Sequence, residues 1–324
     1  MKPLLSAILA TALAALLPTA ASAQAFPNRP IRVVTPFSAG SGPDAALRVV
    51  ADKLGHQLGT SVIVDNKPGG NGFIALSEAK RAPADGYTLV QMDDTHMSLM
   101  PYLHKSVPYD MLKDFQPVQT LLRTNFFVVV PANSPWKNVG DLLAAAKAKP
   151  GALTYGSWFI GSPGHLGAVV MQRATDTDML HIPFKNTPDV YQAVAANDVN
   201  WAFGTAGSAG PLQRAGKVKF LALAAPKRFA TFADVPTVAE AGGPADLEVK
   251  AWVVLQAPKG TPADVVAKLN DAIAKVLKLP EVRDQFANAG FEPMISSPAE
   301  ITTLIQADMK RYAEVVKQSR ITAE

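Results

Sequence analysis

The residues best suited to chemistry lie in loops that are rich in glycine and small polar side chains. The first such loop runs from Thr35 to Asp44, between a predicted strand and a predicted helix. Its small residues let backbone N–H groups face outward, and Pro43 suits the first turn of the helix. An anion site at a helix N-terminus and an ordinary helix cap explain this pattern equally well. The candidate ligand contacts in this loop are Phe37, Ser38, Ala39, Gly40, Ser41 and Asp44.

The second loop runs from Asn66 to Phe73 and also connects a predicted strand to a predicted helix. It contains Gly70-x-Gly72-x-x-Ala75, a nominal dinucleotide fingerprint with acids about twenty residues further on. We reject that reading because Lys67-Pro68 lengthens the turn that the first glycine should make tight. The loop is either a structural turn or a second set of backbone donors facing the first loop. Its candidate ligand contacts are Gly70, Asn71, Gly72 and Phe73.

Two further loops follow later strands of the predicted fold, at 156–165 and 204–208. Ser162 is expected to be an N-cap, and His165 then lies in the first turn, either as a donor toward a cleft or as a structural histidine. Trp158 suits the core as well as a partly exposed position. The candidate ligand contacts in these two loops are Trp158, Gly161, Ser162, His165 and Thr205.

The residue patterns of common enzymes are absent from the chain. It has no cysteine, no G-x-S-x-G and no H-x-x-x-H pair among its five histidines. Asp93 and Asp94 are neighbours on an extended segment, so their side chains point to opposite faces, and we interpret them as solvated loop acids. We therefore predict no catalytic residue, no metal site and no cofactor. An exported hydrolase is the alternative from another functional class.

The elements that position these loops follow from the hydrophobic pattern. Short β-branched runs alternate with helical patterns, which is typical of largely parallel sheets in α/β proteins. In such sheets ligands bind beyond the carboxyl ends of the strands, where all four loops lie. Three helices, each opened by a proline, are expected at 262–279, 280–289 and 298–318. The predicted strands are 31–35, 61–65, 87–92, 126–131, 153–157, 199–204 and 218–224.

The length of the chain favours two domains, because about 300 residues exceed what one core organises comfortably. We predict that residues 24–124 and 225–324 form the first domain and that 125–224 form an inserted second one. The two chain crossings would then serve as the hinge. The net charge of +4 is small, and the Lys and Arg residues are scattered along the chain, so we predict no nucleic-acid partner. A monomer is expected.

The N-terminus has the order of a secretory signal peptide. Lys2 precedes an apolar run from Leu4 to Ala20, and Ala21-Ser22-Ala23 supplies small residues before Gln24. Pro18 interrupts the run, which is shorter than the about twenty residues that a membrane span needs. We predict cleavage after Ala23 and a periplasmic protein.

From about Phe26 to the C-terminus, the chain resembles the Bug (Bordetella uptake gene) receptors of tripartite tricarboxylate transporters, the TctC-like substrate-binding proteins. The matching segments are Pro36-Phe37-x-x-Gly40-x-x-x-Asp44, Val64-x-Asn66-Lys67-Pro68-Gly69-Gly70, Ala82-Pro83-x-Asp85-Gly86-Tyr87 and Asp234-Val235-Pro236-Thr237. The resemblance implies a type II, two-domain periplasmic-binding-protein-like α/β fold that closes on a ligand in the cleft between its domains.

The resemblance also implies a function: capture of a small organic carboxylate for membrane permease subunits of such a transporter. The acid is a dicarboxylate, a tricarboxylate, an amino-acid-like molecule or an aromatic acid. Asp44 is then expected to cap its own helix, or to pair with a donor at the far end of the ligand. Ser41 and Asn186 depart from the family pattern, so the ligand is not copied from better-known members. A sensor subunit of a two-component system is the alternative within binding proteins.

Overall fold

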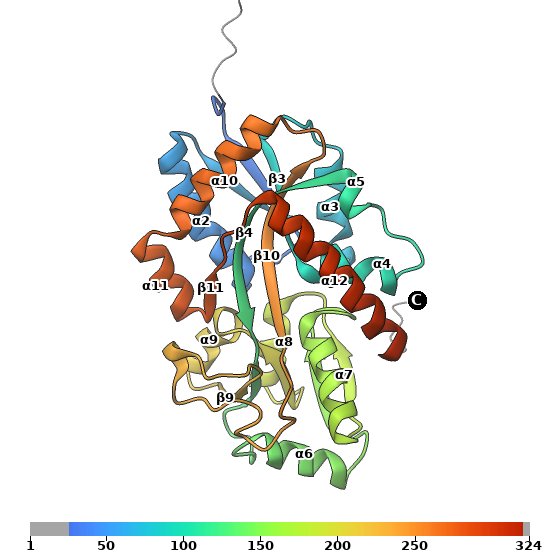
Figure 1. Ribbon diagram of the computed structural model, residues 1–324. Helices are drawn as coiled ribbons and strands as arrows, with labels where there is room; N and C mark the ends of the chain where they lie inside the picture. The colour runs from blue at the N-terminus through green and yellow to red at the C-terminus, as the bar shows by residue number, and fades with distance from the viewer. Residues whose placement is uncertain (1–25, 320–324) are drawn as a thin grey trace, which may run out of the picture.

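The computed structural model describes residues 26–319, which form two lobes, each built on its own sheet (Figure 1). The predicted signal peptide at 1–23 lies outside these residues. The α/β class and the two-domain arrangement of the prediction are confirmed. Within the described part of the chain, no helix is both long and apolar enough to cross a membrane.

The first lobe contains a six-stranded sheet with the order β11-β4-β10-β3-β1-β2. Its β1 is parallel to both β2 and β3, whereas β10 runs antiparallel to β3 and β4. The β-branched sequence of β1 suits this buried central position. The strands are β1 (Ile31–Thr35), β2 (Val62–Asn66), β3 (Thr88–Asp93), β4 (Phe115–Asn125), β10 (Lys250–Pro258) and β11 (Phe291–Pro293).

Helices cover both faces of this sheet. One face packs against α2, α10 and α11, and the other packs against α3 and the C-terminal α12. Helix α2 begins after Ser41, with proline in its first turn, and ends at Gly59 in the left-handed region. The helices are α2 (Gly42–Leu58), α3 (Phe73–Lys80), α4 (Met100–Leu103), α5 (Met111–Asp114), α10 (Ala263–Leu277), α11 (Pro280–Asn288) and α12 (Pro298–Ser319).

The second lobe contains a five-stranded sheet with the order β7-β6-β8-β5-β9. Strands β6, β7 and β8 are parallel, and β5 pairs antiparallel with β8 and β9. The strands are β5 (Phe127–Pro131), β6 (Thr154–Ser157), β7 (Leu180–Pro183), β8 (Trp201–Gly204) and β9 (Val218–Leu223). The helices are α6 (Val139–Ala148), α7 (Pro163–Thr175), α8 (Thr187–Ala195) and α9 (Ala206–Arg214).

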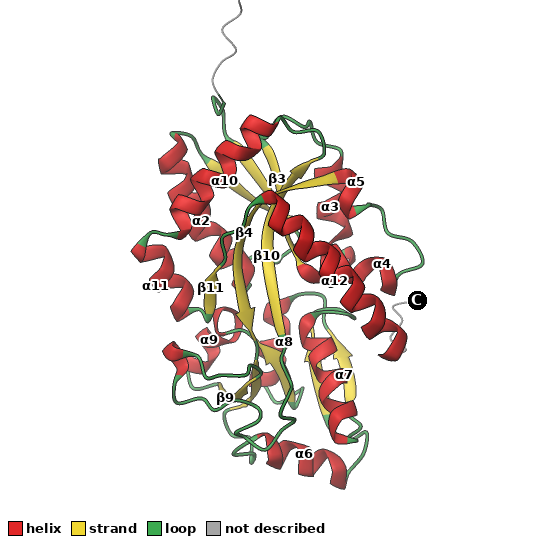
Figure 2. Ribbon diagram, in the orientation of Figure 1, coloured by secondary structure: helices red, strands yellow, loops and turns green. Residues whose placement is uncertain are grey.

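Two long strands, β4 and β10, run side by side from one lobe toward the other (Figure 2). At the crossing, Phe126 N–H donates to the Val249 carbonyl over 3.0 Å, and Val249 N–H donates to the Ala224 carbonyl over 3.0 Å. The predicted boundary at residue 224 stays a prediction. We propose a boundary near Val249, because Val238 and Leu247 are buried in the core of the second lobe.

The structure adds strands that the pattern did not predict. Strands β4, β7 and β10 were missed, and β11 separates α11 from α12, where three helices without intervening strands were expected. The first two predicted C-terminal helices agree with α10 and α11 to within a few residues. Because β10 is almost entirely buried, its sequence lacks the alternation that marks a half-exposed strand.

Candidate functional site

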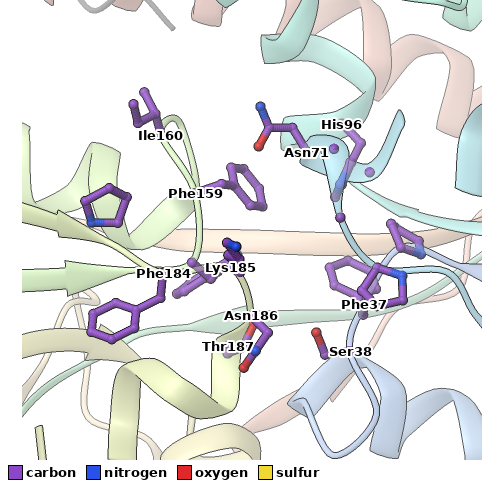
Figure 3. A pocket seen from close by; sticks show the side chains of 17 residues that line it. Phe37, Ser38, Asn71, His96, Phe159, Ile160, Phe184, Lys185, Asn186 and Thr187 are labelled. Atoms are coloured by element: carbon purple, nitrogen blue, oxygen red, sulfur yellow. The ribbon is translucent and has the colours of Figure 1, made fainter. Parts of the chain in front are cut away.

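A cleft of about 420 Å³ lies between the two lobes (Figure 3). From the first lobe it receives the loop after β1, the loop after β2 and His96, which follows β3. From the second lobe it receives the loop after β6 and the loop between β7 and α8. The lining residues are Pro36, Phe37, Ser38, Pro68, Gly69, Gly70, Asn71, Gly72, His96, Trp158, Phe159, Ile160, Pro183, Phe184, Lys185, Asn186 and Thr187.

The structure brings only part of the predicted set of ligand contacts to this cleft. The candidates that line it are Phe37, Ser38, Gly70, Asn71, Gly72 and Trp158. The candidates that do not line it are Ala39, Gly40, Ser41, Asp44, Phe73, Gly161, Ser162, His165 and Thr205. Their roles as ligand contacts stay predictions, and most of them have local structural partners instead.

Asp44 organises the loop that follows β1. Its carboxylate is 2 % exposed and accepts hydrogen bonds from Gly40 N–H (2.9 Å), Arg48 Nε (3.1 Å) and Asn66 Nδ2 (2.7 Å). Asn66 Nδ2 also donates to the Phe37 carbonyl over 2.9 Å. Asp44 therefore links the loop after β1 to Asn66 at the end of β2. This agrees with a capping role rather than with direct contact to a ligand carboxylate.

The loop after β2 reaches the cleft through residues with left-handed backbone. Asn71 has a φ of 52° and Gly72 a φ of 85°. A Cβ atom on Gly72 would lie 2.4 Å from the imidazole of His96, so the absence of a side chain makes room for that ring. Phe73, in contrast, points into the first lobe, where its ring packs edge-on against His104 and Tyr109.

The contact between the lobes also involves two helix N-termini, behind the cleft. Gly42 N–H at the start of α2 donates to Ser208 Oγ in the first turn of α9 over 2.9 Å. Thr205 caps α9 by accepting from Ser208 N–H, and it lines a small inner cavity of about 30 Å³ together with Phe37 and Trp158. The hydroxyl of Ser41 is buried without a hydrogen-bond partner among the described residues.

The loop after β6 contains a buried pair of histidines. Ser162 caps α7 by accepting from His165 N–H, and Gly161 N–H donates to His165 Nδ1 over 3.1 Å. The ring of His165 lies 4.2 Å from that of His181, measured between centroids. Burial, and to a smaller extent His181, lowers the pKa of His165 to about 4, and burial lowers the pKa of His181 to about 4. His165 thus has hydrogen-bond and ring partners within its own lobe and does not line the cleft.

This pair predicts a pH dependence of stability. Because both pKa values are lowered in the folded state, the unfolded chain binds protons first, and the pair loses stability as pH falls from about 6.5 to 4. Replacing His165 with Asn keeps an acceptor for Gly161 and removes one titrating group. Between pH 7 and pH 4.5, the free energy of unfolding should fall by about 2 kcal/mol less in the variant than in the wild type.

Denaturant unfolding of the wild type and the variant at several pH values measures this difference. The other titrating groups are the same in both proteins, so their contributions cancel in the comparison. His56, whose side chain is 79 % exposed on α2, provides the matched control. His56→Asn removes an exposed imidazole, and its profile is the reference for the His165 variant. Parallel profiles for the wild type and the His165 variant would contradict the prediction.

Asp93 and Asp94 are buried, so the interpretation as solvated loop acids is wrong. Their side chains do point to opposite sides. Asp93 accepts from Thr95 and His96, whereas Asp94 accepts from the Tyr312 hydroxyl over 2.5 Å and from Trp252 N–H over 3.4 Å. The C-terminal helix α12 buries Asp94, and no local pattern indicates a partner this far along the chain.

Sequence reasoning missed His96 and the segment that connects β7 to α8. Asn186 caps α8 by accepting from Asp189 N–H over 3.1 Å, and a proline lies in the first turn. Asn followed by Thr-Pro-Asp is a recognisable helix start, so the segment had a signal that the missed strand β7 concealed. His96 had a weaker signal, its position just after a predicted strand.

The two lobes, their crossing strands and the cleft between them define a solute-binding receptor with the type II periplasmic-binding fold. The family model described as "Tripartite tricarboxylate transporter family receptor", TctC, matches residues 46–321. The chain belongs to this family, as the resemblance predicted, and it is a periplasmic solute-binding protein of the TctC type. Protein BugT of Bordetella pertussis is 31 % identical over 92 % of this chain and 91 % of its own length.

Solved structures agree with this assignment. Rpa4515 of R. palustris, solved with adipate, is 30 % identical, covers 92 % of this chain and 99 % of its own, and superposes with a TM-score of 0.88. MatC of Rhodopseudomonas palustris, solved with bound malate, is 29 % identical, covers 90 % of this chain and 100 % of its own, and gives a TM-score of 0.82. The matching family is a family of transporter receptors.

Proposed function

We propose that this protein captures a small organic carboxylate in the cleft and delivers it to the permease of a tripartite tricarboxylate transporter. The charge of the cleft carries the proposal: among the described residues that line it, none is Asp or Glu, whereas Lys185 and His96 are present. Helix α8 begins at the same wall, and a helix N-terminus favours an anion. The adipate and malate in the neighbouring structures are both carboxylates.

The rest of the proposal concerns export and partners. Residues 1–23 act as a signal peptide that is cleaved, and the mature monomer works in the periplasm. It binds its ligand without altering it, so ligand released from the protein is chemically unchanged. The lobes close on the ligand by a hinge motion at β4 and β10, and the closed protein delivers the ligand to the permease.

A thermal-shift screen of the purified protein tests the binding step. The panel contains dicarboxylates, tricarboxylates, amino acids and aromatic acids, each beside its neutral amide, which has nearly the same shape without the charge. A ligand at about one hundred times its Kd adds about 2.7 kcal/mol of stability. For a chain of this size we expect a rise in Tm of about 5 °C or more.

The amides serve as the matched control of the same experiment. At least one carboxylate should raise the Tm while its amide does not. If no carboxylate stabilises the protein, or if acids and amides stabilise it equally, the proposed function is wrong.

A further inference from the structure

His96 is held rigidly at the edge of the cleft in the first lobe. It is 2 % exposed and lies in the short π-helix Thr95–Leu99 that follows β3. Asp93 accepts both the His96 backbone N–H (3.0 Å) and the ring Nδ1–H (2.6 Å). The Tyr109 hydroxyl donates to the His96 carbonyl over 2.6 Å. The orientation of the ring is therefore determined by protein contacts rather than by a ligand.

The other nitrogen of this ring faces the cleft. With Nδ1 bound to Asp93, Nε2 has no hydrogen-bond partner within residues 26–319, and His96 lines the cleft. Figure 3 shows the imidazole reaching into the cleft from the first lobe, across from Phe159 of the second lobe. The two ring centroids are 5.8 Å apart. Nε2 is thus an unpaired polar atom on a buried residue that lines the cleft.

The neighbouring acids Asp93 and Asp94 have pKa values that are shifted in opposite directions. Burial acts to raise the pKa of Asp93, but the charge of His96 and the hydrogen bonds from His96 and Thr95 outweigh it, so this pKa is lowered and Asp93 is ionised. Burial, and then the charge of Asp93, raises the pKa of Asp94 to about 8, so Asp94 is neutral at pH 7. Asp93 occupies Nδ1, so a ligand carboxylate at Nε2 would be a second acceptor on the same ring.

A cationic side chain, Lys185, lies on the opposite wall. Lys185 is exposed in the segment between β7 and α8, and it makes no hydrogen bond or ion pair within the described part of the chain. The carboxylate of Asp189 nearby is engaged by Asn186 Nδ2 over 2.5 Å. Lys185 is therefore available to a ligand, and it stands in the second lobe whereas His96 stands in the first (Figure 3).

The space between His96 and Lys185 is largely apolar. Phe37 packs edge-on against His96 with a centroid distance of 5.6 Å, and Phe159, Phe184 and Trp158 line the cleft from the second lobe. An apolar or aromatic group in this space would bury surface without leaving polar atoms unpaired.

We infer that His96 and Lys185 are two anchors for the two ends of one ligand, and that the cleft selects a dicarboxylate with an apolar or aromatic middle. This inference rests on the proposed function and makes it narrower. Each carboxylate would bind one lobe, so a ligand with both charges would also hold the closed state.

Calorimetric titration of unbranched dicarboxylates of four to eight carbons and of benzene dicarboxylates, each beside its monoamide, tests the inference. The best dicarboxylate should bind at least about 10-fold tighter than its monoamide, because a hydrogen bond to a charged group contributes about 1.5 to 3 kcal/mol. In the Lys185→Met and His96→Asn variants this preference should disappear, because the dicarboxylate and its monoamide are then each held by a single carboxylate. Lys275→Met, on the distant α10, is the control and should keep it.

A pair of amide variants separates ligand binding by His96 from a purely structural role. Asn at this position keeps a donor for Asp93 and loses the atom that faces the cleft, whereas Gln places an amide near the position of Nε2. The inference expects His96→Gln to retain more of the preference than His96→Asn. A purely structural role expects the reverse order, and Lys185→Met tests the second anchor at an exposed position that folding does not require.

Failure of this inference differs from failure of the proposed function. If no carboxylate binds, the proposed function is wrong. If carboxylates bind but the monoamides bind as tightly as the diacids, or if the preference survives both His96→Asn and Lys185→Met, only the two-anchor inference is overturned.

Discussion

Replacing Gly72 with Ala should lower the affinity for the carboxylate ligand about 10- to 100-fold, an effect equal to losing one hydrogen bond to a charged group. The added Cβ would lie 2.4 Å from the imidazole of His96 and 3.3 Å from the Pro36 side chain. Asp93 binds the ring of His96 at Nδ1 and Tyr109 binds its backbone carbonyl, so the ring is fixed in place. The loop after β2 must move instead, and it carries Gly70 and Asn71 away from the cleft.

Gly40 provides the matched control for this variant. It also has a positive φ, 79°, in a loop of the first lobe, but a Cβ there would meet no atom within 4 Å. Gly40→Ala therefore carries only the backbone penalty, about 1 kcal/mol, without the clash. Calorimetric titration of both variants measures the difference. Equal affinity of the two variants would show that the contact between Gly72 and His96 does not shape the site.

Replacing Asp44 with Ala should lower the free energy of unfolding by about 3 kcal/mol, because a buried carboxylate that accepts three hydrogen bonds is lost. Gly40, Arg48 and Asn66 then lose a common acceptor. The side chain of Arg48 is half exposed and regains water, which keeps the loss below that of a fully buried pair. The binding loop should loosen as well, so that ligand affinity falls together with stability.

Asp52 lies on the same helix, α2, and supplies the control. Its side chain is 62 % exposed, and its contacts with Lys53 and His56 are both 3.7 Å long. Such surface pairs contribute less than about 1 kcal/mol, so Asp52→Ala should be close to neutral. Urea unfolding of both variants provides the comparison. A loss that is as small for Asp44 as for Asp52 would refute the role given to the Asp44 network.

The loops of the first lobe were predictable because their signals are local. Pro43 in a first turn, a glycine where φ is positive and Asp44 beside a helix start follow from a few adjacent residues. These signals placed Phe37, Ser38, Gly70, Asn71 and Gly72 correctly at a strand-to-helix edge, and these residues line the cleft. Asp44 was among the candidate contacts and was also expected to cap its own helix or to pair with the far end of the ligand, and its carboxylate is buried.

The second lobe was predicted less completely. His165 and Thr205 have the expected positions at helix starts, yet the cleft is lined by Phe184, Lys185 and Asn186. The missed strand β7 is the cause, because its sequence is short and only partly buried. Without that strand, the loop that follows it had no assigned place at the edge of a sheet.

The sequence by itself determined the α/β class, seven of the strands, several helix starts and the family, because these depend on patterns of neighbouring residues. The tertiary structure alone decided which side chains meet. The burial of Asp94 depends on Tyr312, more than two hundred residues away along the chain. The pairing of His96 with the opposite wall depends on how the lobes are joined by β4 and β10. Contacts between distant segments are created by packing and by the topology of the two sheets, and no local pattern specifies them.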